Sequence, residues 1–432
     1  MPVLEKIDVV DVAEPQVATP ADREQVDAEL HRLQRLEEPV QPQVAAPSGQ
    51  KRVHALSIRF QELDGLRGMA ALIVITAHYL SGPALYSHAL HRILDLVVLS
   101  PITVDMFFIL SGFLVGGILL NTRNSDNYYK TFYMRRLYRV MPVYYAYIAA
   151  FLLIAFVAPG ARGLLVPQGY SIARFTAGFA EFRQNLWHFP EWDATAPWFN
   201  TTWTLAIEEH FYLVAPFCLL RLGRRHLIAG LSAVIYLSPI GRVLASHFFG
   251  QSDPWGVTYT STIYRADALA MGVLLAVLWD TPAYKSWICQ RVNWFYRGFF
   301  LLAPVSIGIG YMAMKQIPHT ASFAIGFGRS AVEAWSLCLI LIALINQGKS
   351  NVAWMRLRLL RQVGKISYCA YLIHCGVLWS VLHFGFHAVA GAGLRTDIPA
   401  AAISFVLTFG ISILSWNYFE APLQRLGHSF TY

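Results

Sequence analysis

The sequence predicts an all-α, polytopic membrane protein, a transmembrane bundle of about ten helices. Of its 432 residues, 56% are hydrophobic and only 14% are charged, whereas soluble proteins carry about 25% charged residues. Apolar runs of about 20 residues recur from Arg67 onward, and this is the length that a helix needs to cross the hydrocarbon core of a bilayer. The 12 Trp residues suit a protein that is anchored at two membrane interfaces.

Ten apolar runs carry this prediction. They cover residues 67–86, 93–119, 138–157, 202–220, 227–248, 262–280, 297–314, 328–347, 367–388 and 398–418. Residues 1–55 are polar, with repeated Pro-Gln and Glu-Pro steps, so we expect a disordered or weakly helical cytosolic tail before a transmembrane domain over residues 56–432. No cleavable signal peptide is expected, because the first 20 residues lack a basic region followed by an apolar run.

The distribution of basic residues predicts the orientation. The net charge of +8 comes from Lys and Arg in short loops rather than from one basic face, which argues against a nucleic-acid partner. One set of loops is rich in them: Arg123, Lys130, Arg135, Arg136, Arg221, Arg224, Arg225, Lys285, Arg291, Arg297, Lys349, Arg356, Arg358, Arg361 and Lys365. By the positive-inside rule these loops and both termini are cytosolic, in an inner (plasma) membrane. The outward connection 158–200, with Trp187, Trp192 and Trp198, is expected on the membrane surface.

The cysteines indicate neither disulfides nor a metal site. The five are Cys218, Cys289, Cys338, Cys369 and Cys375. Their number is odd, most lie in apolar runs, and none has a CxxC partner, so we interpret them as small core residues.

The useful signal is polar chemistry within apolar helices, because an ionisable group at the bilayer centre costs about 2.5–3.5 kcal/mol and usually faces a cavity or a partner. Arg67 and His78 are eleven residues apart, almost three whole turns, so they share one face of the first helix and stand about 16 Å apart along its axis. This spacing suits a channel with an anionic ligand at its mouth. Alternatively, Arg67 extends to the interface and His78 is a satisfied core histidine.

Other predicted helices also carry polar or charged residues, and each of these has a functional and a structural interpretation. Asp105 and Ser111 lie in the second run, where Gly112 allows close helix approach. Ser111 either acts as a nucleophile or bonds to backbone. The next helix begins with Arg135, Arg136 and Arg139, which suit phosphate or anionic lipid.

The fourth run holds Glu208, Glu209 and His210. An ion pair explains only one of the two carboxylates. Adjacent helical residues point about 100° apart, so one carboxylate can face a cavity and the other a neighbouring Arg. Arg265 and Asp267 lie near the outer end of the sixth run, either paired with other helices or within the headgroups, and His374 is another candidate pore residue.

Together these segments resemble acyltransferase family 3, a family of integral membrane proteins. The resembling motifs occur in family order over about residues 59–425: Leu63 to Gly68 with Arg67-x10-His78, Val104 to Leu114, Arg135-Arg136-x2-Arg139-x2-Pro142, Trp203 to Tyr212, Arg265-x-Asp267, Ile366 to Tyr368 and Glu420-x-Pro422. His210 stands where the family often has Gln, and Cys369 where Ser is common.

The resemblance implies an O-acyltransferase that moves an acyl group, expected to be acetyl, from acyl-CoA to a hydroxyl of a carbohydrate. The acceptor would be lipopolysaccharide, exopolysaccharide or another glycan. No cofactor or metal is expected to stay bound. His78 is the expected general base, since an imidazole takes up and releases a proton near neutral pH. The other roles expected are catalytic support by Glu208 and Glu209; donor binding by Arg67, Arg135, Arg136 and Arg139; and acceptor or supporting contacts by Asp105, Ser111, Trp203, Arg265, Asp267 and His374.

Two other classes remain open at this point. A transporter or flippase of a lipid-linked sugar would use the same intramembrane charges as a substrate pathway without consuming acyl-CoA. A purely structural membrane partner would tolerate replacement of Arg67, His78 and Glu208.

Overall fold

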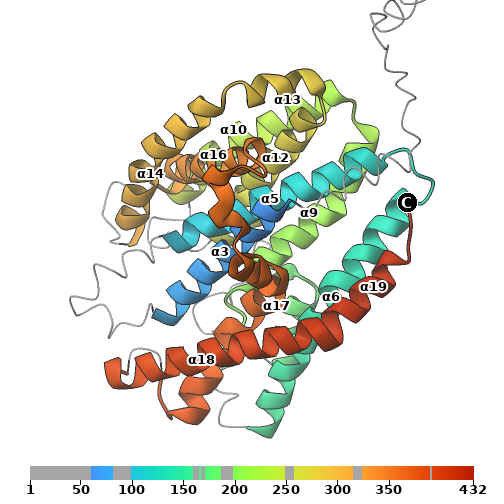
Figure 1. Cartoon of the computed structure of the whole chain (residues 1–432). Coiled ribbons are helices and arrows are strands. Elements are labelled where there is room, and N and C mark those ends of the chain that lie inside the picture. Colours follow the sequence, from blue (N-terminus) through green and yellow to red (C-terminus); the bar gives the residue numbers. More distant parts are fainter. Residues whose placement is uncertain are drawn as a thin grey trace, which may run out of the picture. The chain divides into compact units, whose positions relative to one another are not determined.

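The computed structural model describes residues 60–80, 99–158, 165–166, 171–185, 198–248, 257–314, 324–389 and 392–432, and helices dominate them (Figure 1). The long helices in this part of the chain are α3 (Gln61–Leu80), α5 (Leu99–Thr122), α6 (Tyr128–Val157), α9 (Thr202–Arg221), α10 (Arg224–Phe248), α12 (Thr262–Trp279), α14 (Val292–Met314), α16 (Arg329–Ile345), α17 (Arg358–Ser380) and α18 (Leu394–Ser415). Each corresponds to one predicted apolar run. The described residues contain no strand, and the predicted all-α class is confirmed.

Shorter helical segments connect these helices. They are α8 (Ile172–Ala180), η3 (Arg183–Asn185), α11 (Val257–Thr260), α13 (Pro282–Cys289), η5 (Ala324–Gly328), η6 (Ser350–Arg356), η7 (Val381–Gly385), η8 (Trp416–Glu420) and α19 (Ala421–His428). The predicted tail, residues 1–55, lies outside the described residues, as do residues 81–86 and 93–98 of the first two predicted runs.

Helix boundaries differ from the predicted runs mainly at basic segments. α6 begins at Tyr128 rather than near residue 138, and α17 begins at Arg358 rather than near residue 367. Arg and Lys are good helix formers, so the helix continues through a basic segment that a search for apolar runs leaves out. The three Arg of the α6 motif therefore lie within a helix and not at its first turn.

Within the described residues, nine helical segments are long and apolar enough to cross a membrane. α9, which carries Glu208 and Glu209, is the long helix that is not among them. The chain is thus a multi-pass membrane protein, and α9 is the long helix in the described part of the chain that carries two adjacent carboxylates.

Glycines set two close helix crossings. α5 packs on α12, and α3 packs on α17. A Cβ at Gly112 of α5 would overlap the carbonyl oxygen of Leu269, and one at Gly68 of α3 would overlap that of Leu360. Without side chains at these points the helix backbones approach closely, which is how small residues promote helix packing in membranes.

The other long helices pack around this centre. α16 packs on α14 and α5, α10 packs on α12, and α18 packs on α17. In Figure 1, α18 continues through the π-helical turn η8 into α19, which packs on α6. The structure therefore brings the C-terminal segment beside the basic end of α6.

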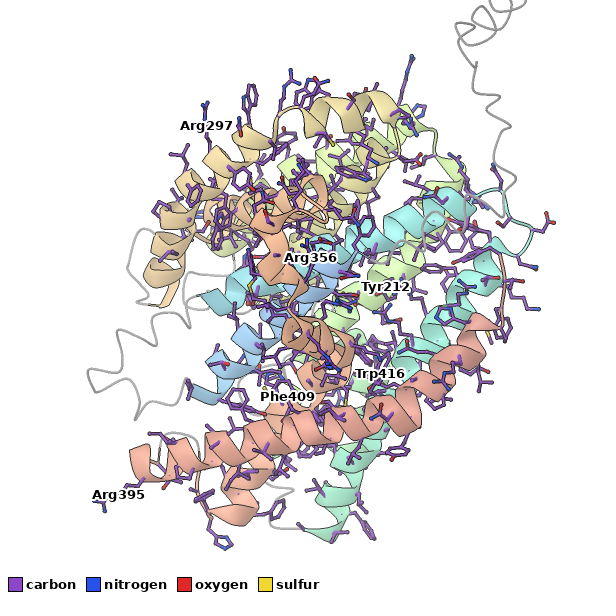
Figure 2. All side chains as sticks on the ribbon, viewed as in Figure 1. Tyr212, Arg297, Arg356, Arg395, Phe409 and Trp416 are labelled. Atoms are coloured by element: carbon purple, nitrogen blue, oxygen red, sulfur yellow. The ribbon has the colours of Figure 1, made fainter. Side chains whose placement is uncertain are left out.

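The outer surface is apolar where lipid is expected. Large hydrophobic side chains such as Phe156, Tyr236 and Leu301 are exposed. Figure 2 shows Arg297 and Arg395 directed away from the helices, whereas Tyr212 of α9 lies among them. Each side chain thus meets the surroundings that its chemistry favours.

One expectation about the long outward connection is wrong. Trp198 is buried, and its ring stacks on that of Tyr147 with centroids 5.4 Å apart. It belongs to an aromatic core with Phe151, Phe179 and Phe199, and not to the membrane surface, because this core offers the indole more apolar contact than an interface does. Trp187 and Trp192 lie outside the described residues.

Candidate active site

A cavity opens among α3, α5, α9 and α17. It holds about 610 Å³ of space that atoms do not fill, part of which is open to the outside. Its lining is mostly apolar with a few polar groups: Arg67, Val104, Phe107, Phe108, Thr201, Thr204, Leu205, Glu208, Ser367, Tyr368, Tyr371 and Leu372. This combination is typical of small-molecule sites.

The positive charge of the cavity comes from Arg67. Among the described residues, no hydrogen bond or ion pair holds its guanidinium group. Arg139 of α6 lies within electrostatic range of Arg67, Arg136 and Glu208. Three guanidinium groups thus gather near Glu208, and two further carboxylates, Glu209 and Glu420, lie in range of Arg136 and Arg139 respectively. A cluster of Arg side chains of this kind can bind a phosphate or another anion.

Glu208 is tied to this group through Tyr212, one helical turn further along α9. The Tyr212 hydroxyl donates to Glu208 Oε2 at 3.1 Å and accepts from Arg136 Nη1 at 3.4 Å. Ser111 Oγ lies 3.5 Å from the same hydroxyl. Ser111 therefore neighbours a phenol, and no imidazole or carboxylate is among its hydrogen-bond partners in the described residues, so nothing there would activate it as a nucleophile.

The three adjacent polar residues of α9 point in different directions, as the helical geometry predicts. Glu208 faces the cavity. His210 Nδ1 lies 2.8 Å from Thr262 Oγ1 of α12. Glu209 Oε1 is buried, and no hydrogen-bond partner for it occurs in the described part of the chain. Arg136 of α6 lies in electrostatic range of Glu209, which agrees with the expectation of a neighbouring Arg for the second carboxylate. The hydrogen bond of Glu208 goes to Tyr212, and the predicted catalytic support by Glu208 and Glu209 remains a prediction.

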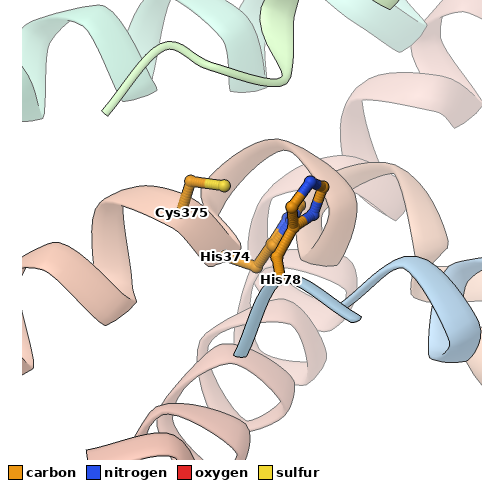
Figure 3. Close-up of side chains that lie close together, drawn as sticks. All are labelled: His78, His374 and Cys375. Atoms are coloured by element: carbon orange, nitrogen blue, oxygen red, sulfur yellow. The ribbon is translucent and has the colours of Figure 1, made fainter. Parts of the chain in front are cut away.

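His78 pairs with His374 of α17. His78 Nδ1 and His374 Nε2 are 2.9 Å apart, and their ring centroids are 5.0 Å apart. Figure 3 shows the two imidazoles side by side, with the Cys375 side chain directed toward them. His374 Nδ1 lies 2.6 Å from the carbonyl oxygen of Tyr371. Since Tyr371 also lines the cavity, this residue connects the cavity with the histidine pair.

The same pair belongs to the group that could hold a metal ion. Within the described residues, ligand atoms of His78, His374 and Cys375 lie within 4.8 Å of one another. Two imidazole nitrogens and a thiolate are suitable ligands for zinc. This arrangement was not predicted from the sequence, because the two histidines lie on separate helices and Cys375 lies in an apolar run.

A second polar cluster lies deeper among α5, α9 and α12. Arg265 pairs with Asp105, and neither side chain is more than 1% exposed. Its guanidinium carbon lies 5.7 Å from the ring centroid of Trp203, which stands at the start of α9. Arg329 Nη1 approaches the same Asp105 at 3.5 Å. Asp105, Trp203 and Arg265 are thus brought together, and the cluster adjoins the cavity through Phe108, whose ring centroid lies 5.4 Å from the Arg265 guanidinium carbon.

Asp267 is paired with Arg242 of α10 at 2.6 Å, and both side chains are fully buried. Arg242 also donates to the backbone of Gly326 and Tyr264. Glu333 of α16 is buried in electrostatic range of Asp267 and Arg242. The alternative that Arg265 and Asp267 lie in the headgroups is therefore wrong. Each finds a partner on another helix, because an unpaired buried charge is far more costly than a paired one.

Arg135 faces away from the cavity group. Its Nε donates to the backbone oxygen of Phe430 at 2.9 Å, and its guanidinium carbon lies 5.0 Å from the Tyr432 ring centroid. The C-terminal segment thus engages Arg135, whereas Arg136 and Arg139 lie on the side of Glu208. The predicted roles of all these residues in binding or catalysis remain predictions.

Sequence reasoning missed several residues that complete these clusters. Arg242, Arg329 and Glu333 are charged residues within predicted apolar runs, so the criterion that found Asp105 and Glu208 also applies to them. Tyr212 lies four residues after Glu208, the spacing of neighbours on one helix face. Tyr371 gave no comparable signal, since an aromatic residue in a membrane helix is common.

Comparison with known proteins finds a family and several relatives of this chain. A family described as an acyltransferase domain matches residues 60–417. The chain is 25% identical over 388 residues to the O-acetyltransferase OatA of Staphylococcus aureus (strain NCTC 8325 / PS 47), covering 84% of this chain and 57% of the relative. It is 25% identical over 378 residues to the peptidoglycan O-acetyltransferase OatA of Listeria monocytogenes, covering 84% and 56%.

A shorter match is 30% identical over 236 residues to the putative peptidoglycan O-acetyltransferase YrhL of Bacillus subtilis, covering 52% of this chain and 34% of the relative. The chain therefore spans little more than half the length of the two OatA relatives. No solved structure matches it.

Proposed function

Because the chain belongs to the family of acyltransferase domains, acyltransferase family 3, we propose that it is an O-acyltransferase. It moves an acyl group, expected to be acetyl, from acyl-CoA to a hydroxyl of a carbohydrate. The names of the relatives support O-acetylation, and two of them name peptidoglycan, so a cell-envelope glycan is the first acceptor to test.

One structural observation carries the proposal. α3 places Arg67 in the cavity and His78 in a histidine pair that adjoins the same cavity through Tyr371. A cation for the donor and an imidazole for proton transfer thus come from a single helix. A helix that only faces lipid or only packs against other helices would need neither this cation nor this imidazole.

The donor would lie in the cavity with its phosphates beside Arg67, Arg136 and Arg139. Arg binds phosphate through two parallel hydrogen bonds, which orients the ligand as well as holding it. The apolar side chains that line the cavity suit the pantetheine arm. Tyr371 then marks the direction in which the thioester would point.

The chemistry needs no enzyme nucleophile, because a thioester is already activated. His78 removes the proton of the acceptor hydroxyl as its oxygen attacks the acyl carbon. The new carbon–oxygen bond forms, the carbon–sulfur bond breaks, and the proton on His78 passes to the departing CoA sulfur. The imidazole is thereby restored, and no electron donor or further reactant is needed.

Membrane placement completes the proposal. The helices support a multi-pass protein in the lipid bilayer. We place it in the inner (plasma) membrane with both termini in the cytosol, where acyl-CoA is made, and the acceptor on the outer side. The transfer would then take place within the helical bundle, between a donor and an acceptor that enter from opposite sides.

The test uses membranes that contain the protein, acetyl-CoA with a labelled acetyl group, and soluble peptidoglycan fragments or a total glycolipid extract. His78→Ala is compared with His226→Ala, which replaces an exposed histidine at the start of α10, at equal membrane abundance. We expect label on carbohydrate with the wild type and His226→Ala and at least a hundredfold less with His78→Ala. Equal transfer by all three would exclude His78 as the base.

The transporter alternative predicts another result. Proteoliposomes would move a lipid-linked sugar across the membrane without consuming acetyl-CoA. Such movement, with no labelled carbohydrate from any acceptor fraction, would replace the proposal. Loss of Arg67 would impair both activities, so consumption of the thioester is the measurement that separates them.

A further inference from the structure

The hydrogen bonds of His374 determine where its own proton lies. His374 Nδ1 is 2.6 Å from the backbone oxygen of Tyr371, three residues earlier on α17. A carbonyl oxygen can only accept a hydrogen bond, so His374 Nδ1 must carry the hydrogen. In the neutral ring the other nitrogen, Nε2, is then an acceptor.

That acceptor faces His78. The 2.9 Å separation of His374 Nε2 and His78 Nδ1 is a hydrogen bond that needs one proton between two nitrogens. With His374 Nε2 as the acceptor, the proton belongs to His78 Nδ1. The unprotonated nitrogen of neutral His78 is consequently Nε2.

We propose that His374 is a positioning residue that fixes His78 in the Nδ1–H tautomer. On the proposed function, this makes His78 Nε2 the atom that accepts the proton of the acceptor hydroxyl. The tautomer itself follows from the geometry alone. Its value for catalysis rests on the proposed acyl transfer.

The surroundings hold the His374 ring in this orientation. Its side chain is fully buried, with the rings of Tyr371 and Tyr79 at centroid distances of 5.7 and 6.0 Å. The Tyr79 hydroxyl donates to the His374 backbone oxygen at 3.2 Å and lies 2.6 Å from Thr408 Oγ1. α3, α17 and α18 thus meet at His374, and a ring flip would break the bond to Tyr371.

The pair also suits the charged stage of the reaction. When His78 Nε2 takes up a proton, the ring carries one positive charge and still donates through Nδ1. The shared proton can then move toward His374 Nε2, which spreads the charge over two rings. Its return precedes transfer of the Nε2 proton to the CoA sulfur, so the proton count is unchanged.

Bound zinc is the competing use of these atoms. It would replace the shared proton and add Cys375 Sγ as a third ligand. The hydrogen bond accounts for both facing nitrogens without an ion, so we favour the proton. The two uses exclude each other, because a nitrogen lone pair cannot bind zinc and accept a hydrogen bond together.

The experiment compares two replacements of His374. His374→Gln places a carbonyl oxygen near the position of Nε2 and keeps an acceptor for His78. His374→Phe keeps the ring volume and removes the acceptor. The full-length protein is labelled with ¹⁵N-histidine, and His78→Ala assigns the His78 signals among the 14 histidines. The ¹⁵N shifts of neutral His78 report which nitrogen carries the proton, whether or not the protein is active.

We expect the Nδ1–H tautomer in the wild type and His374→Gln, and its loss in His374→Phe. We also expect kcat to fall by about 10²–10⁴-fold in His374→Phe and by less than tenfold in His374→Gln, with the KM for acetyl-CoA unchanged in both. An Nε2–H tautomer in the wild type would overturn the proposal. So would one zinc per chain in purified protein that is lost in Cys375→Ser.

The readouts separate this inference from the proposed function. If the wild type transfers no acyl group but has the Nδ1–H tautomer, the proposed function fails and the tautomer assignment stands. If the wild type is active and His374→Phe equals it in kcat, the positioning role fails and the acyltransferase proposal stands.

Discussion

Arg242 and Asp267 form an ion pair at 2.6 Å with neither side chain exposed, and they join α10 to α12. The same two helices are also linked at their other ends, where Arg224 meets Asp280 at 3.0 Å with side chains 45% and 40% exposed. The same two helices are thus joined by one buried and one exposed Arg–Asp ion pair. The two pairs differ mainly in the surroundings of their charges, which determine how much an ion pair contributes to stability.

Asp267→Asn is expected to destabilise the protein by about 3–5 kcal/mol, because it leaves the Arg242 charge buried without its counter-ion. Asp280→Asn is the matched control and should cost at most about 1 kcal/mol, since water screens that pair. The measurement is the thermal denaturation midpoint of both variants in one detergent. Equal shifts would show that the buried pair is not a major source of stability.

Arg67→Gln should weaken donor binding specifically through the phosphates. Loss of a charge-assisted contact of about 1.5–3 kcal/mol would raise the KM for acetyl-CoA about 10- to 100-fold. An acetyl thioester of N-acetylcysteamine has no phosphate, and its KM should stay the same. Arg225→Gln, at an exposed position at the start of α10, is the control. A parallel rise in KM for both thioesters would contradict phosphate binding by Arg67.

Glu208→Gln should separate binding from turnover. Glu208 is the carboxylate that faces the cavity beside Arg67, with Arg136 and Arg139 nearby. Its removal lessens repulsion of an anionic donor, so the KM for acetyl-CoA should fall or stay unchanged. Turnover should fall at least tenfold if Glu208 binds the acceptor. The measurement is steady-state kinetics with the concentrations of both substrates varied. An unchanged kcat would exclude a role of Glu208 in binding the acceptor.

Gly112→Ala should disturb folding although the change is only one methyl group. The added Cβ would overlap the Leu269 backbone oxygen where α5 crosses α12, whereas a Cβ at Gly117 on the same helix meets nothing within 4 Å. Overpacking costs about 1–3 kcal/mol, while Ala is about 1 kcal/mol better than Gly within a helix. Gly112→Ala should therefore lower the denaturation midpoint, and Gly117→Ala should leave it unchanged or raise it. Equal midpoints would exclude a tight crossing.

The fold could be predicted from the sequence because a membrane helix is a long continuous run of apolar residues. Such a run can be recognised locally, without knowledge of contacts between distant parts of the chain. All ten predicted runs correspond to long helices. Even α9 was found, despite its carboxylates, since its remaining residues are apolar enough to mark a run. The boundaries were less accurate, because α6 and α17 begin with basic segments, which a search for apolar runs leaves out.

The candidate site was predictable only in part. Arg67 and Glu208 could be selected individually as costly charges, and both line the cavity. Their partners depend on contacts between residues far apart in the chain, such as His78 with His374 and Arg242 with Asp267. A sequence shows which groups need a partner but not which partner they meet. For the same reason Arg135 could not be distinguished from Arg136 before the C-terminal segment was placed.

The polarity of α9 has a consequence for how the protein is made. A helix with two adjacent carboxylates is poorly retained by lipid alone, so α9 needs protein neighbours when it leaves the insertion machinery. α5 and α6, which both contact α9, have already been synthesised by then, whereas α12, which also packs on α9, follows later in the chain. α9 would enter the bilayer against α5 and α6 and gain further contacts when α12 arrives. Premature termination between α9 and α12 should consequently yield a fragment that membrane quality control removes quickly.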